Sequence, residues 1–439
     1  MVRKLTEVGV VDLWQRAVRT GRCPGTVDHE PVRVLYPGRP SDVPGADFQD
    51  TVLEIGGRVI KGNIEVHVRA EDWRRHGHHH DAAYNGVVLH VVMWPDGQPR
   101  TALENGAAIP IVALDRQARG RTPGGQARVP PLPCRAAAGK HGMLEAIERA
   151  GDARFREKAA VFARELKSSD AGQCLYRGIM TALGYSRNQA PFGLLAERLP
   201  LAPLTEVTRT GTGTMALTRL EAMFMGTAGF LLSQRGNRVA ENHPWLDALE
   251  GEWRLSGMDG RIACPAWRLF RVRPGNHPAR RLAGMARLLW RYREKGLLGS
   301  LTQAMEIATP ENGGLRLVEF TTVAADGYWT DHCDVGQVCR GLKPFLIGPS
   351  RARDIAVNIL LPFAAAWSET AARPELAATA MALYQTCPPG AENAIERHMR
   401  AQFGLKPAAV NTARRQQGLL HLYKRFCTQA RCGECSLVV

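Results

Sequence analysis

Apolar and polar residues alternate with a period of two over residues 60–69, and this pattern predicts a β-strand. Glu65 and His67 fall on the same face of that strand, which we expect to be the solvated face. An apolar run at 48–55 precedes it, and glycines between the two runs indicate a turn. We therefore expect 48–55 to pair antiparallel with 60–69.

Residues 86–94 are apolar on both faces, which is typical of a central strand covered on both sides. His90 stands alone in this run and is expected to be a hydrogen-bonded core histidine. The charged segment 73–85 has the length of a helix. Its polar cluster can be interpreted as metal ligands or as a polar helix start, and it consists of His76, His78, His79, His80 and Asp81.

The pattern changes after residue 114. Residues 115–141 are rich in proline, glycine and arginine without periodicity, which indicates a linker or a surface loop. From residue 142 to residue 439 the periodicity is mostly helical, with no fixed repeat. The predicted fold class is therefore mixed α+β, with an α/β domain over 1–114 followed by a helical domain over 142–439.

The chain has 439 residues, which favours two or three domains, and its formal net charge is +15. That charge favours an anionic partner such as nucleic acid, although a diffusely basic surface is the alternative. A predicted helix over 280–295 places four basic residues on one stripe, where they contact phosphates or form a solvated face. They are Arg280, Arg287, Arg291 and Lys295.

The N-terminus has no apolar signal core, and no apolar stretch approaches the roughly twenty residues that a membrane span needs. We therefore expect no membrane segment. Ten cysteines without a secretion signal favour a cytoplasmic location, with free or metal-bound thiols instead of a disulfide framework.

Three cysteines follow the last predicted helix with the spacing of metal ligands. Cys427, Cys432 and Cys435 can converge on one zinc ion or one iron–sulfur cluster. Cys134 is the first candidate for a fourth ligand; other candidates are Cys23, Cys387 and His421. The alternative is three thiols in a frayed tail.

Two carboxylates are predicted to meet on neighbouring strands. Asp47 opens the run at 48–55, so antiparallel pairing brings it within reach of Glu65. Such a pair can hold Mg²⁺ or Mn²⁺ against a phosphate, and His67 can add a base, a charge donor or a third ligand. Alternatively, Asp47 caps a turn, and Glu65 and His67 are surface residues.

Many separate blocks of the chain resemble one bacterial family, the domain-of-unknown-function family 2851. They include GADF, GNIEVHV, DWxxHxHxxD, AYNGVVLHVV, ALGYSRNQAPFGLLA, EAMFMGTAGFLL, RPGNHPARRLAGMA and the C-terminal CxxxxCxxC, and they run from about Glu7 to Cys435. Asp47 with Glu65-Val66-His67 is also similar to the PD-(D/E)XK nuclease signature. In that signature an Asp and an Asp/Glu-X-Lys bind Mg²⁺ and align a water; here His67 replaces the lysine.

The second resemblance implies a PD-(D/E)XK-like α/β domain and a metal-dependent nuclease-like protein acting on DNA or RNA. Asp47, Glu65 and His67 would be its catalytic residues. Some nucleases of this class staple their fold with an iron–sulfur cluster, held by one cysteine before the core and three after it. The alternatives are a non-catalytic nucleic-acid-binding protein on a degenerate nuclease fold, or an assembly protein that meets another macromolecule such as the ribosome.

Overall fold

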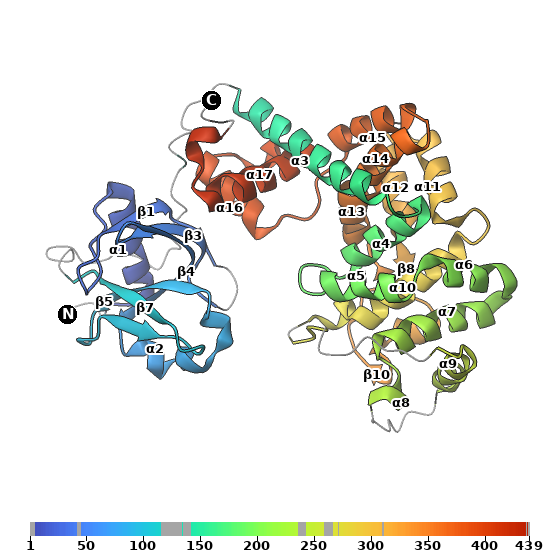
Figure 1. The fold of residues 1–439 in the computed structure, drawn as a ribbon, viewed down its shortest axis with the longest axis horizontal. Helices are drawn as coiled ribbons and strands as arrows, with labels where there is room; N and C mark the ends of the chain where they lie inside the picture. Colours follow the sequence, from blue (N-terminus) through green and yellow to red (C-terminus); the bar gives the residue numbers. More distant parts are fainter. Residues whose placement is uncertain are drawn as a thin grey trace. The chain divides into compact units, whose positions relative to one another are not determined.

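The chain folds into two compact units in the computed structural model (Figure 1). Unit 1 comprises Met1–Ala153, Glu392–Asn411 and Arg415–Val439, and unit 2 comprises Arg154–Ala391 and Thr412–Arg414. The residues that the structure describes are 5–41, 45–115, 134, 142–235, 243–258, 267–270, 272–309, 311–435 and 437. The predicted linker 115–141 therefore lies outside the described residues, except for Asp115 and Cys134.

Unit 1 is built on one seven-stranded sheet with the strand order β1-β3-β4-β5-β7-β6, in which β2 pairs with β3. β3 and β4 are antiparallel, as predicted, whereas β4, β5 and β7 run parallel. The elements of this part are α1 (Glu7–Thr20), β1 (Val32–Tyr36), β2 (Arg39–Pro40), β3 (Phe48–Ile55), β4 (Arg58–Arg69), α2 (Asp72–Arg75), β5 (Val87–Trp94), β6 (Arg100–Ala102) and β7 (Ala108–Ala113).

Both faces of the central strands are covered. Val10 and Trp14 of α1 belong to the same buried cluster as Val66, so α1 covers one face of the sheet. Glu65 and His67 share the other face, as the alternation predicted. That face is not solvated, however, because Glu65 is 6% exposed and His67 is 1% exposed. The prediction of a wet face was wrong because the segment between β4 and β5 covers it.

The segment between β4 and β5 is not the single helix predicted over 73–85. α2 ends at Arg75, and Gly77 has a left-handed backbone with φ 78°. Two 3₁₀ turns follow, at His78–His80 and Ala82–Tyr84. A residue without a Cβ adopts this left-handed conformation at little cost, so the chain reverses here and brings its histidines back over β4.

The C-terminal helices α16 (Ala394–Phe403) and α17 (Ala413–Arg425) complete unit 1. Tyr36 and Val52 of the sheet pack in one buried cluster with side chains from both helices, and the Tyr423 hydroxyl donates to an Asp50 carboxylate oxygen at 2.5 Å. The structure groups these helices with the sheet, whereas the sequence analysis assigned all of 142–439 to one helical domain. Apolar contacts between residues distant in sequence leave no local pattern, so the sequence could not show that these helices pack against the sheet.

Unit 2 is mostly helical. α3 (Met143–Glu165) leads into it. Two short antiparallel strand pairs, β8 with β11 and β9 with β10, lie within it. Its principal elements are α4 (Ala171–Leu183), α5 (Gln189–Arg198), α6 (Leu201–Thr210), α7 (Gly213–Ala228), α8 (Leu232–Arg235), α9 (Pro244–Leu255), α10 (Pro278–Arg291), α11 (Gly296–Glu306), α12 (Gly313–Thr321), β8 (Val323–Ala324), β9 (His332–Asp334), β10 (Gln337–Val338), β11 (Phe345–Ile347), α13 (Pro349–Ile355), α14 (Leu361–Thr370) and α15 (Glu375–Thr386).

Two features of unit 2 differ from the sequence expectations. The helical stretch Gly213–Arg235 is long and apolar enough to cross a membrane by length and composition, but 67% of its apolar window is buried inside the protein, as in a core helix. Cys333 and Cys339 form a disulfide, although only free or metal-bound thiols were expected.

Candidate metal centre

Asp47 and Glu65 meet at the open end of the β3–β4 pair. Phe48 is paired with Ile64, which places the residue before β3 opposite Glu65. The backbone N–H of Asp47 donates to Glu65 Oε2 at 3.2 Å, and the N–H of Val66 donates to Asp47 Oδ2 at 2.9 Å. The two carboxylates therefore converge on neighbouring strands, and backbone amides fix both of them.

Burial makes both carboxyl groups more stable with a bound proton or cation than as free anions. Burial, followed by the negative charge of Asp47, raises the pKa of Glu65 far above its ordinary range. Burial also raises the pKa of Asp47, and the charge of Glu7 at the start of α1 adds to that shift. Two close carboxylates of this kind share a proton at neutral pH, or a metal ion replaces that proton.

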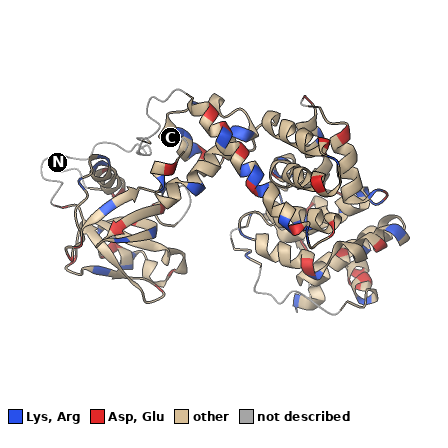
Figure 2. Cartoon of the chain, turned by 45° about the horizontal axis from the view of Figure 1, so that its top comes forward, with Lys and Arg blue, Asp and Glu red and all other residues tan. Residues whose placement is uncertain are grey.

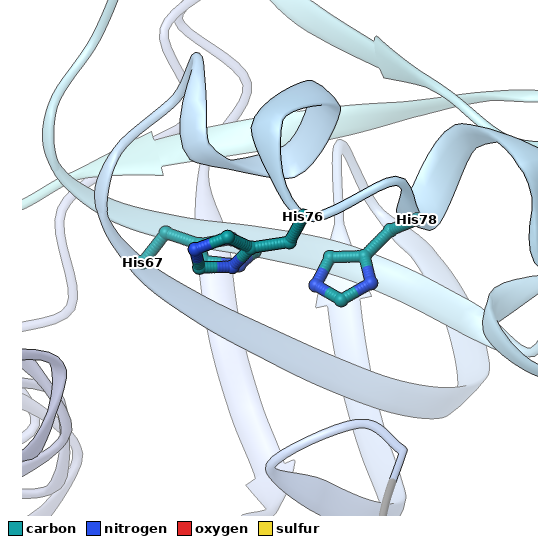
Figure 3. Close-up of side chains that lie close together, drawn as sticks. All are labelled: His67, His76 and His78. Carbon is teal, nitrogen blue, oxygen red and sulfur yellow. The ribbon is translucent and has the colours of Figure 1, made fainter.

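Three histidines lie close together (Figure 3), and two of them contact Glu65. His67 comes from β4, while His76 and His78 flank Gly77 in the covering segment. One nitrogen from each ring can be chosen so that all three lie within 4.8 Å of one another. The His78 Nε2 atom is 3.5 Å from Glu65 Oε1, and the His67 Nε2 atom is 3.7 Å from the same oxygen.

These spacings fit a single divalent ion. Ligand atoms about 2.1 Å from a metal lie roughly 3 to 3.5 Å apart in tetrahedral or octahedral geometry. The 3.5 Å contact of Glu65 with His78 is of this size, as is the 3.2 Å between His76 Nδ1 and His67 Nε2, and the 3.7 Å contact of Glu65 with His67 is slightly longer. Burial lowers the pKa of His67 to about 3, with the positive charges of the other histidines adding to the effect, and also lowers that of His78. Both rings are thus neutral, which is the form that binds metals.

A buried relay orients the central imidazole. His67 Nδ1 lies 2.9 Å from His90 Nε2, and His90 Nδ1 lies 2.9 Å from Thr101 Oγ1. If His67 Nε2 is to keep its lone pair for a metal, its Nδ1–H must donate to His90. His90 must then carry its own proton on Nδ1 and donate to Thr101, so a single tautomer assignment satisfies every member.

Aromatic rings enclose the centre. Trp73 is 1% exposed and packs edge-on against His67 and His78, and its Nε1–H donates to Ala102 O at 3.1 Å. The Tyr84 ring lies 3.9 Å from the His78 ring between centroids. These rings limit the positions of the histidines and exclude water from one side of the cluster.

The structure thus brings together Asp47, Glu65 and His67, the predicted catalytic residues. It adds partners that the sequence analysis left as alternatives or missed. The DWxxHxHxxD block carried the signal for His76 and His78, whereas Glu7 and Thr101 carry no local signal. The added residues are Glu7, His76, His78, His90 and Thr101.

The four predicted cysteine ligands lie in unit 1, but the metal-ligand atoms of described residues that lie within 4.8 Å of one another belong to the three histidines and not to these cysteines. Cys134 and Cys427 pack on the same buried cluster as Cys435. Burial raises the pKa of the Cys427 thiol well above its usual range, and negative charge on Cys134, Cys435 and Cys432 raises it further. Cys134 is thus the neighbour of the C-terminal trio. The other cysteine candidates lie in different clusters, Cys23 beside α1 and Cys387 in the core of unit 2.

Two of the four residues in the predicted basic stripe bind partners inside unit 2 and are not exposed. Arg280 is fully buried and donates to backbone carbonyls, including those of Trp329 and Phe345. Arg287 pairs with Glu221 and Asp326 and is 12% exposed.

The other two stripe positions remain accessible. Arg291 is the last residue of α10, and Lys295 lies beyond the helix. In the described part of the chain, basic and acidic positions are interspersed over both units and do not form one band (Figure 2). A helical periodicity cannot distinguish a solvated face from one that carries structural arginines.

The fold and this cluster define a two-unit α+β protein with a histidine and carboxylate centre on the sheet of unit 1. The chain belongs to the family described as protein of unknown function (DUF2851), whose model matches residues 9–393. No curated protein and no solved structure is significantly similar to the chain.

Proposed function

We propose that unit 1 is a metal-dependent phosphodiesterase that acts on the backbone of DNA or RNA. One observation carries this proposal: the Asp47 and Glu65 carboxylates converge beside the rings of His67, His76 and His78. The placement of the carboxylates on adjacent strands agrees with the PD-(D/E)XK signature that the sequence resembles.

The ligand set favours a first-row transition ion over Mg²⁺. Mg²⁺ prefers oxygen ligands, whereas imidazole suits ions such as Zn²⁺, Fe²⁺ and Ni²⁺, and Mn²⁺ accepts mixed nitrogen and oxygen sites. Three neighbouring imidazoles, two of them in contact with Glu65, therefore shift the expectation from Mg²⁺ or Mn²⁺ towards Mn²⁺, Fe²⁺ or Zn²⁺. This ion would also supply positive charge beside His67, which stands where the nuclease signature has a lysine.

Each residue then has a distinct role. Glu65 with the three histidines would hold the ion, and the ion would lower the pKa of a bound water so that hydroxide forms near neutral pH. Asp47, whose pKa burial raises towards neutrality, would accept a proton from the attacking water. His90 would keep His67 in its ligating tautomer, as a positioning residue.

The net charge of +15 supports a polyanionic substrate, because a positive protein raises the local concentration of phosphate esters and steers their approach. The competing possibility is nucleic-acid binding without hydrolysis. It predicts salt-dependent binding with no cleavage under any divalent ion.

The test combines metal analysis with cleavage of labelled single- and double-stranded DNA and RNA. Purified protein should bind about one ion at the histidine centre, and cleavage should require Mn²⁺, Fe²⁺ or Zn²⁺. Glu65→Gln and His78→Ala should abolish cleavage while the protein stays folded. His80→Ala is the matched control, because His80 is an exposed imidazole in the same segment and lies outside the cluster. Equal activity in His78→Ala and wild type would refute the proposal.

The cysteine group is proposed as a second, structural metal site. Cys134, Cys427, Cys432 and Cys435 would hold zinc or an iron–sulfur cluster that ties the C-terminal tail to the chain before α3. Because thiolate sites contribute directly to folding, Cys432→Ser should lower bound metal and melting temperature together. Cys23→Ser is the control, since that cysteine lies outside the group. Visible absorbance identifies a cluster, and a colourless zinc protein identifies a structural ion; full metal occupancy in Cys432→Ser would exclude the site.

A further inference from the structure

Unit 2 contains a cavity of about 670 Å³ that the metal centre does not use. Its walls come from the turn before α10, the loop that follows the Cys333–Cys339 disulfide, and the start of α13. This volume is within the range of small-molecule sites, which runs from about 300 to 1,000 Å³.

The lining of the cavity is strongly cationic. Five basic side chains line it, with Asp354 as the lining carboxylate. The basic residues are Arg273, Arg281, Arg340, Lys343 and Arg351. Arg273, Arg340 and Lys343 are exposed, and no described carboxylate pairs with any of them. Grouping like charges is costly unless an anion joins them, so the lining favours an anionic ligand.

Hydrogen bonds and ring stacking fix the side chains at the floor of the cavity. Arg281 is 5% exposed, and its guanidinium donates to the Tyr185 hydroxyl at 2.9 Å and to Asn276 Oδ1 at 2.6 Å. The Arg351 guanidinium stacks 3.3 Å from the centre of the Tyr185 ring. Tyr185 itself has a left-handed backbone, with φ 52°, which a side chain of this size adopts rarely. The surrounding structure therefore holds two guanidinium groups in fixed positions at the floor.

Arg280 supports the loop that forms another wall of the cavity. Its buried guanidinium donates to the backbone carbonyls of Lys343 and Phe345 at 3.5 and 3.3 Å. Consecutive arginines of α10 thus serve one cavity: Arg280 fixes the backbone of the loop, and Arg281 lines the space itself. The loop backbone that carries the exposed Lys343 is therefore anchored from the core.

We propose that this cavity binds the phosphate of a nucleotide, with Arg281, Arg340, Lys343 and Arg351 around the phosphate oxygens. Arginine and lysine are the side chains that bind phosphate best, and arginine does so in a planar fork. Phe345 and Leu342 provide apolar surface for the nucleoside. The phosphate comes from a free mononucleotide or from the 5′ end of a strand.

The test measures binding in the presence of a chelator, so it does not depend on the metal centre. Adenosine 5′-monophosphate is compared with adenosine by calorimetry, and a short oligonucleotide with a 5′-phosphate is compared with the same strand bearing a 5′-hydroxyl. Arg340→Gln and Lys343→Gln remove exposed cations and leave the core intact. Arg198→Gln removes an exposed cation of α5 elsewhere in the same unit and serves as the control.

Adenosine 5′-monophosphate should bind more tightly than adenosine, or the 5′-phosphorylated strand more tightly than the 5′-hydroxyl strand, or both. Each cavity variant should weaken that binding about 10-fold, the loss expected for one charge-assisted hydrogen bond. Arg198→Gln should bind as wild type does. Preference for the mononucleotide identifies a free ligand, and preference for the phosphorylated strand identifies a strand end. If the phosphate changes neither comparison, or if the cavity variants bind as tightly as Arg198→Gln, the proposal is overturned.

Discussion

His67 Nδ1 lies 2.9 Å from His90 Nε2, inside the sheet of unit 1 and away from solvent. Burial holds the pKa of His90 well below its usual range, so the ring is neutral and has one proton to place. In the tautomer that carries this proton on Nδ1, His90 donates a hydrogen bond to Thr101 Oγ1, and His90 Nε2 accepts one from His67. The Nε2 atom of His67 is thereby free to face Glu65 and the other two histidines.

Replacing Thr101 with valine should weaken metal binding without removing a ligand. Without the hydroxyl, His90 loses the partner that fixes its tautomer, and the orientation of His67 relaxes. Loss of such a partner typically costs 10- to 100-fold in metal affinity. Competition with a chromophoric chelator measures the change, and the melting temperature of the metal-free variant shows whether the fold is intact. An unchanged affinity would mean that the relay does not act on the centre.

Gly77→Ala should lower metal affinity, whereas Gly97→Ala should not. Both glycines have left-handed backbones, with φ 78° and 88°, and an added Cβ meets nothing within 4 Å at Gly77 or Gly97. Each substitution should therefore cost on the order of 1 kcal/mol through backbone strain alone. Only Gly77 separates His76 from His78, so only there does a backbone shift move two ligands. Similar losses of stability in the two variants, with weaker metal binding in Gly77→Ala only, would support this role of Gly77. Equal metal affinities in the two variants would contradict it.

One strand pairing could be predicted from the sequence because alternation and turns are local signals. The pairing of 48–55 with 60–69 follows from them, and with it the meeting of Asp47 and Glu65. Burial of Glu65 could not be predicted, because it depends on the segment between β4 and β5. That segment breaks at a glycine, so its histidines fold back over the strand instead of continuing a helix.

Other parts of the site depend on contacts that are distant in sequence. Thr101 reaches His90 across the sheet, and Glu7 approaches Asp47 from the first helix. The C-terminal cysteines had a recognisable spacing, but their return to unit 1 depends on apolar packing against Tyr36. The prediction that Arg280 and Arg287 face solvent on α10 was wrong for a related reason. Arginines that bind partners distant in sequence have the same spacing as arginines that face water.

The stability of the metal-free protein should depend on pH through Glu65. Its pKa is raised in the folded state, whereas in the unfolded chain it ionises near the ordinary value of about 4.3. The unfolded state therefore releases its proton first as the pH rises, and the folded state loses stability above that value until its own pKa is passed. His67 acts in the opposite direction, because its pKa is lowered and its contribution is lost as the pH falls.

Comparing wild type with Glu65→Gln isolates the carboxylate from the histidines. In urea denaturation without metal, the variant should gain stability relative to wild type between pH 5 and pH 8. Saturating metal should reverse the order at pH 8, because the ion stabilises the ionised carboxylate of wild type only. A constant difference between the two proteins across this range, with and without metal, would show that Glu65 ionises normally.

Arg280→Leu should destabilise unit 2 strongly, while Arg291→Gln should change little. Arg280 is fully buried, and its guanidinium donates to several backbone carbonyls around the loop of unit 2, so its removal leaves buried acceptors without donors. Such unsatisfied groups cost about 1 to 3 kcal/mol each, so the loss should be on the order of 3 kcal/mol. Arg291 is an exposed residue of the same helix that donates to the Thr322 carbonyl, and its replacement should stay within about 0.5 kcal/mol. Chemical denaturation measures both values. Equal stability of the two variants would restore Arg280 as a candidate for phosphate contact and would remove it as the anchor of the cavity wall.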